Sequence, residues 1–194
     1  TFQSVSASVV KAGGSATIAG GGFHHTSPQT GVKTITVGGA TLGTSAWAVN
    51  GPTQITITGP NSTVAAGALV FVDSAGNTLT TSTNFAVDVT APAITSITNT
   101  SGASINNIAR SGQTVRINGN AGGWTTNGTP TVKVENTAPG GGLFSIAGTN
   151  AAYIDITIGT DNTRENEAPE VIVIDAAGNE SADGGPLDID NRVP

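Results

Sequence analysis

The sequence predicts an all-β protein made of two antiparallel β-sandwiches in tandem, and three observations support this prediction. β-Branched and alternating apolar segments recur along the chain, and turn signals such as Asn-Gly separate them about every ten residues. No longer window shows a helical apolar period without a Gly or Pro that interrupts it. Motifs also repeat at a fixed distance, which divides the chain into units that each have the length of one sandwich.

The repeat defines the domain organisation. The sequence DSAGN at 73–77 returns as DAAGN at 175–179, which is 102 positions later. The Asp and the Pro that end the first unit return at 190–194 with the same offset. We therefore predict two domains, 1–92 and 93–194, and expect the chain to be a segment of a longer tandem array.

Strands are predicted wherever the alternating or β-branched pattern is clear. In the first unit these segments are 2–9, 16–19, 32–37, 53–58, 69–73 and 84–89. In the second unit they are 93–98, 114–118, 131–135, 152–158, 170–175 and 187–189. The stretch 124–150 is rich in Gly, Thr and Asn and departs from a simple repeat, so only one strand is assigned within it.

Composition and charge exclude several classes of protein. The chain has no Cys, so it has no disulfide, no thiolate metal site and no cysteine nucleophile. It also has no apolar run long enough for a transmembrane helix. The net charge of −6 lies entirely in 93–194, because 1–92 contains two acids and two bases. Nucleic acids and membrane surfaces are also negatively charged and would repel this chain. We therefore expect neither a nucleic-acid partner nor membrane insertion.

Particular segments resemble known families. The first unit contains SATIAGGGF at 15–23, VGG at 37–39, TQITITGP at 53–60 and a Gly-led apolar strand that begins at 67. This order resembles the IPT/TIG branch of the immunoglobulin-like fold. In the second unit, the run VIVIDAAGNES at 171–181 resembles a bacterial immunoglobulin-like repeat of large surface proteins.

The resemblance implies two tandem immunoglobulin-like antiparallel β-sandwiches located outside the cell. Such modules are non-catalytic and serve as stalks, adhesins, accessory parts of secreted enzymes or phage virion components. The residues agree with the expectation that this is no enzyme. The chain has no Gly-x-Ser-x-Gly elbow and only two histidines, so neither a nucleophile nor a base is evident.

One candidate metal site is considered at the junction of the units. Asp88, Asp175, Asn179 and Glu180 could supply oxygen ligands for calcium, which would stiffen the linker. The alternative is that Asp-x-x-Gly-Asn is turn chemistry, with the Asp side chain bonded to its own backbone. No other cofactor is expected, and the sequence leaves both interpretations open.

Two further groups of titratable residues are interpreted as loop residues. His24 and His25 are adjacent, so on a regular strand they would point to opposite faces and could not share a metal. Asp161, Glu165 and Glu167 lack the glycine-punctuated spacing of a calcium-binding loop. We expect both groups to be solvated.

The predicted function is structural and adhesive: a spacer and protein-interaction unit of an extracellular surface assembly. Partners are expected to be copies of the chain or neighbouring repeats that pair with strand edges, and the segment 2–10 is the natural strand to donate. The alternatives are a phage virion component and a carbohydrate-binding accessory module that contacts a cell-surface glycan. Trp47 and Trp124 are expected to be core anchors rather than exposed sugar contacts.

Overall fold

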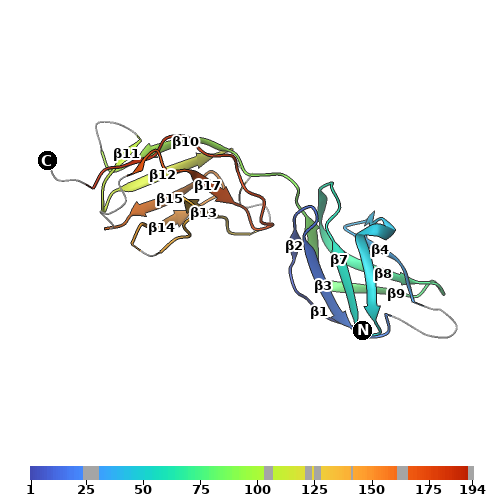
Figure 1. The fold of residues 1–194 in the computed structure, drawn as a ribbon. Helices are drawn as coiled ribbons and strands as arrows, with labels where there is room; N and C mark the ends of the chain where they lie inside the picture. The colour runs from blue at the N-terminus through green and yellow to red at the C-terminus, as the bar shows by residue number, and fades with distance from the viewer. Residues whose placement is uncertain are drawn as a thin grey trace. The chain divides into compact units, whose positions relative to one another are not determined.

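The computed structural model describes residues 1–23, 31–102, 107–120, 124, 128–140, 142–160 and 166–191. Within these ranges the regular structure is β-strand apart from one short 3₁₀ turn, Thr44–Ala46, which confirms the predicted all-β fold class. The chain forms two compact units, Thr1–Thr90 and Ala91–Pro194 (Figure 1). We call them unit one and unit two and describe each by itself.

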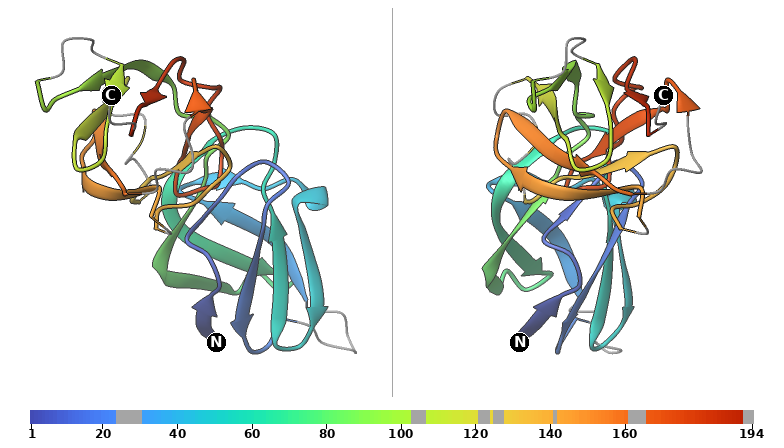
Figure 2. Two further views of the ribbon diagram at one scale, coloured as in Figure 1. Left: turned by 60° about the vertical axis from the view of Figure 1, so that its left-hand side comes forward. Right: turned by 90° about the vertical axis from the view of Figure 1, so that its left-hand side faces the viewer.

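Unit one consists of two sheets that enclose one core, as Figure 2 shows from two further sides. The first sheet is antiparallel and has the strand order β1-β3-β7-β6. Its strands are β1 (Phe2–Val5), β3 (Ser15–Gly20), β7 (Gln54–Thr58) and β6 (Trp47–Gly51). The second sheet has the order β2-β9-β8-β4-β5. Its strands are β2 (Val9–Val10), β9 (Thr78–Val87), β8 (Val64–Asp73), β4 (Val32–Val37) and β5 (Ala40–Thr41).

Unit two repeats this plan. Its first sheet has the order β10-β12-β15-β14 and is antiparallel. The strands are β10 (Ile94–Asn99), β12 (Thr114–Gly119), β15 (Tyr153–Ile158) and β14 (Phe144–Thr149). The opposite side is made of the pair β13-β17 and the group β11-β18-β16. These strands are β13 (Thr131–Val134), β17 (Val171–Ile174), β11 (Ile108–Ala109), β18 (Asp188–Ile189) and β16 (Asn166–Glu167).

Each unit has its own hydrophobic core, because alternate side chains of each central strand point inward. In unit one Ile18 and Ile55 face each other across β3 and β7, and both are fully buried. In unit two Ile117 and Ile154 occupy the matching positions on β12 and β15. β-Branched residues dominate both cores, as the composition predicts.

The hairpin of β8 and β9 contains an irregularity in which a side chain replaces a backbone acceptor. The register shifts between Ala68 and Val70, and the buried Thr81 hydroxyl accepts the Leu69 N–H at 3.0 Å. In unit two, Asp183 lies 102 positions after Thr81, and Val171 lies 102 positions after Leu69. The Asp183 Oδ1 accepts the Val171 N–H at 3.0 Å. The same strand position is therefore satisfied by a side-chain oxygen in both units.

Five strands were not predicted, and each occupies an edge of its sheet: β5, β6, β11, β14 and β16. β6 and β14 each pair with only one neighbour, β7 and β15 respectively. An edge strand needs less apolar surface than a central strand, so its alternation is weak and its Gly and Asn residues resemble turn signals. The predicted 69–73 and 84–89 segments are parts of the longer strands β8 and β9.

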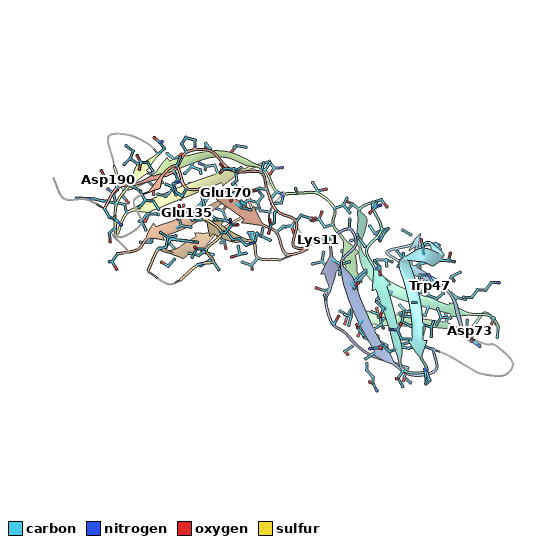
Figure 3. All side chains as sticks on the ribbon, in the orientation of Figure 1. Lys11, Trp47, Asp73, Glu135, Glu170 and Asp190 are labelled. Atoms are coloured by element: carbon cyan, nitrogen blue, oxygen red, sulfur yellow. The ribbon has the colours of Figure 1, made fainter. Side chains whose placement is uncertain are left out.

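The two tryptophans differ in their burial. Trp124 is 1 % exposed, packs on Gly119 and donates its indole N–H to the Ala93 carbonyl at 3.2 Å, which confirms it as a core anchor. Trp47 begins β6, is half-buried and packs against the core of unit one (Figure 3). Within the described part of the chain, its buried Nε1 has no hydrogen-bond acceptor.

Candidate interaction surfaces

The repeated Asp-x-x-Gly-Asn motif forms the same turn in both units. In unit one it joins β8 to β9, where Asp73 Oδ1 accepts the N–H groups of Ala75 and Asn77 at 2.9 and 2.8 Å. Asp73 Oδ2 accepts the Asn77 side-chain amide at 2.8 Å. Gly76 has a φ of 87°, a conformation that glycine adopts without strain. The Asp73 side chain therefore makes the bonds to its own turn that the turn interpretation predicts.

Unit two reproduces the contacts between the Asp and the Asn of the motif after β17. Asp175 Oδ1 accepts the Asn179 N–H at 2.9 Å, and its Oδ2 accepts the Asn179 side-chain amide at 2.9 Å. Gly178 has a φ of 89° and donates its N–H to the Asp175 carbonyl at 3.1 Å. Asp175 is 8 % exposed, so these bonds satisfy a carboxylate that has little contact with water.

The other two residues of the candidate calcium site also make contacts within their own units. Asp88 follows β9, and its Oδ1 accepts the Thr90 N–H at 3.0 Å. Glu180 forms an ion pair with Lys133, with 2.9 Å between Oε1 and Nζ. Among the described residues no three His, Cys, Asp or Glu side chains gather in a group that could hold a metal. The calcium site remains a prediction, and the observed bonds are those of the turn alternative.

We expect Asp175→Ala to destabilise unit two by about 1–3 kcal/mol, because the variant loses charge-assisted hydrogen bonds at a buried position. If the motif acts only as a turn, the fall in melting temperature will be the same with EDTA and with millimolar calcium. Calcium that raises the melting temperature of the native chain, but not of the variant, would instead establish the metal site.

The turn in unit one makes stability depend on pH. The side-chain amide of Asn77 is the main cause that lowers the pKa of Asp73 below its ordinary value of 3.8. Because the pKa of Asp73 is lower in the folded state than in the unfolded state, its carboxylate stabilises the fold at pH values above the unfolded-state pKa. This contribution is lost as the pH falls through the folded-state pKa. We expect Asn77→Ala to raise the pKa of Asp73, as measured by NMR titration. Asn61→Ala, in an exposed loop, should leave it unchanged.

Two predicted groups cannot be placed. His24 and His25 lie outside the described residues, and so do Asp161 and Glu165. The backbone of Glu167 is part of β16, but its side chain is outside the description. Their interpretation as solvated loop residues therefore remains a prediction.

The open edges of the first sheet in each unit are irregular. The outer strands β1 and β6 in unit one, and β10 and β14 in unit two, each pair with a register shift. Bulges of this kind twist an edge and discourage pairing with another chain. The segment expected to be donated is paired within unit one, β1 with β3 and β2 with β9. Pairing of edges between copies remains a prediction, and these bulges oppose it.

A second shared feature is a short pair of parallel strands that joins an early strand of each unit to its last strand. In unit one β2 runs parallel to β9, and the N–H groups of Ala86 and Asp88 donate to the carbonyls of Ser8 and Val10 at 2.9 and 3.0 Å. In unit two β11 runs parallel to β18 with two equivalent bonds, at 2.8 and 3.0 Å. The entering segment of each unit is thus bonded directly to its last strand.

Among the described residues, a third feature occurs in unit two alone, on the outer face of sheet β10-β12-β15-β14. Arg116 on β12 lies opposite Asp155 on β15, and its Nε and Nη2 donate to the two carboxylate oxygens at 2.8 and 2.9 Å. The guanidinium carbon lies 3.5 Å from the centroid of the Tyr153 ring. The hydrogen bond to Asp155 is the main cause that raises the pKa of Arg116.

Polar neighbours extend this face. The Asn118 amide donates to the hydroxyls of Ser96 and Thr98 on β10 at 3.0 and 3.4 Å. We call the set of six residues the polar face: Ser96, Thr98, Arg116, Asn118, Tyr153 and Asp155. The sequence analysis did not find it, because these residues lie on three strands and no local motif joins them.

Comparison with known proteins gives little beyond the fold. No family model matches the chain, and no curated protein matches it either. Among solved structures, the surface glycan-binding protein PbSGBP-B from Prevotella bryantii is 17% identical, with a TM-score of 0.41. That match covers 93% of this chain but only 38% of that protein. The fibronectin(III)-like modules of Clostridium thermocellum CbhA are 17% identical over 97% of this chain and 90% of theirs, with a TM-score of 0.34.

A tandem from titin is 12% identical over 98% of this chain and 66% of its own length, with a TM-score of 0.35. These structures are β-sandwich proteins of the immunoglobulin and fibronectin type, and the specific IPT/TIG resemblance remains a prediction. The described part of the chain contains no helix of the length and apolar character needed to cross a bilayer.

Proposed function

We propose that this chain is a non-catalytic spacer and interaction module of an extracellular surface assembly, and that it resists force along the chain. The observation that supports this proposal is the parallel pair β2·β9 in unit one and its equivalent β11·β18 in unit two. Each unit also has a hydrophobic core of its own, as a string of independently folding units requires.

The parallel pairs determine how the units respond to tension. Tension along the chain pulls the entering segment of a unit and its last strand in opposite directions. In a parallel pair these forces slide the strands along each other, so the inter-strand bonds are strained together rather than opened one by one. Sliding is opposed by all of these bonds at once, and each unit should therefore resist force better than a sheet that is peeled from one end.

Single-molecule force spectroscopy of the chain between inert handles tests this proposal. We expect two unfolding events, each of which releases about 30 nm for a unit of about 90 residues at ~3.6 Å per residue. Val10→Pro removes an N–H from the β2·β9 pair and should lower the force of one event.

The matched control is Ala48→Pro on the edge strand β6, which lies outside the parallel pair. This variant should lower the melting temperature of unit one but leave its unfolding force nearly unchanged. A single unfolding event, or equal forces in the native chain and in Val10→Pro, would contradict the proposal.

A further inference from the structure

We propose that the polar face of unit two binds a neutral carbohydrate chain. This inference rests on the proposed function as an interaction module and deepens it by assigning a ligand class and a set of residues. The supporting observations are the fixed geometry of Arg116, the cancelled charge of the face, and the contrast between the two units.

The guanidinium of Arg116 is fixed before any ligand arrives. Its bidentate bond to Asp155 sets its plane, and the Tyr153 ring lies against one side of it. The side chains of Arg116 and Asp155 are 34 % and 18 % exposed, so the pair is still reached by solvent. The two bonds to Asp155 account for two of the five N–H groups that a guanidinium carries. A rigid donor of this kind loses little conformational entropy when a ligand binds.

The charge of the face indicates a neutral ligand. The opposite charges of Arg116 and Asp155 cancel, because the two side chains form an ion pair with 2.8 Å between Nε and Oδ1. The remaining members of the polar face are uncharged. A phosphate or carboxylate ligand would meet Asp155 as well as Arg116, so the face does not favour anions. A large apolar partner is also disfavoured, because amide, hydroxyl and guanidinium groups occupy most of the surface.

A carbohydrate matches this chemistry. Each sugar hydroxyl both donates and accepts a hydrogen bond, as do the Ser96 and Thr98 hydroxyls and the Asn118 amide that it would meet. The C–H face of a sugar ring packs on flat groups, and the stacked Arg116 and Tyr153 provide such a group. Neighbouring strands lie about 4.8 Å apart, so polar groups on β10, β12 and β15 can contact successive hydroxyls of one chain.

The comparison with unit one shows that the fold does not require these residues. Ile18 pairs with Ile55 in unit one as Ile117 pairs with Ile154 in unit two, so the two sheets share one register. The positions that correspond to Arg116, Tyr153 and Asp155 are occupied in unit one by Thr17, Gln54 and Thr56. Unit one therefore forms a sheet of the same register with neutral residues at these three positions. A ligand explains why unit two has the ion pair and the aromatic ring.

Affinity gel electrophoresis of the whole chain tests the proposal, with a soluble β-glucan, a galactomannan and a xylan as neutral probes. At least one polysaccharide should retard the native chain, and retardation should be the same at 50 mM and 500 mM salt because the ligand is uncharged. Arg116→Ala and Asn118→Ala should each weaken the apparent affinity at least tenfold. Thr17→Ala and Thr56→Ala, at the matching positions of unit one, should not change it.

Arg116→Ala also removes a cross-strand ion pair, so its melting temperature is measured alongside binding. Asn118→Ala leaves that pair intact and separates loss of binding from loss of folding. Retardation by none of the three polysaccharides, retardation that is lost at 500 mM salt, or equal retardation of every variant would overturn the proposal. Force curves are a separate readout, so failure here leaves the two unfolding events of the spacer proposal unaffected.

Discussion

Gly119→Val is expected to unfold unit two while unit one remains folded. Gly119 ends β12, and a Cβ at this position would overlap the indole ring of Trp124. Trp124 is buried and cannot move outward without opening the core of unit two. We expect a loss of about 3 kcal/mol or more, as for removal of a large core side chain. Thermal unfolding followed by Trp fluorescence measures the change.

The control for this variant is Gly148→Val on β14, in the same sheet. A Cβ at Gly148 meets no atom within 4 Å, so the change should cost about 1 kcal/mol or less. Unit one packs an aromatic ring in a similar way, since a Cβ at Gly20 would meet the Phe23 ring at 2.6 Å. Equal destabilisation by the two substitutions in unit two would show that Trp124 does not anchor its core.

Thr81→Val is expected to destabilise unit one by about 1–3 kcal/mol, although valine has nearly the same shape as threonine. The Thr81 hydroxyl is the acceptor for the Leu69 N–H, and Leu69 is fully buried. Valine would leave this N–H without a partner inside the sandwich. For a unit of this size, the expected loss lowers the melting temperature by roughly 4–24 °C.

Two further variants separate this effect from a general cost of changing β9. Thr81→Ser keeps the hydroxyl and should lose less than about 1 kcal/mol. Thr80→Val alters the exposed neighbour and should change stability by only about 0.5 kcal/mol. The account of the bulge would be wrong if Thr81→Val were as stable as Thr80→Val.

The sequence was sufficient to predict the central strands and the repeat. Alternation around Ile18, Ile55, Ile117 and Ile154 marks strands with one buried face, and this pattern is local. The repeated Asp-x-x-Gly-Asn motif also indicated a turn, because its bonds join residues only two to four positions apart. In these places the local sequence and the tertiary structure favour the same conformation.

The sequence was less informative where pairing between distant residues decides the structure. Arg116 and Asp155 are 39 positions apart, and the register of β12 and β15 alone brings them together. Thr81 lies in a polar, Thr-rich stretch whose sequence gives no sign of burial, but the bulge turns its side chain inward. The bulges of the edge strands were missed for the same reason, since a register shift is a property of two strands and not of one.

Native-state hydrogen exchange of the intact chain tests most directly whether the two sandwiches are self-contained. In the native protein, the core amides of β3 and β7 should exchange through one opening reaction, and those of β12 and β15 through another. In Gly119→Val the amides of β12 and β15 should lose their protection while those of β3 and β7 keep it. Loss of protection in all four strands together would show one cooperative structure and would contradict the account of a tandem spacer.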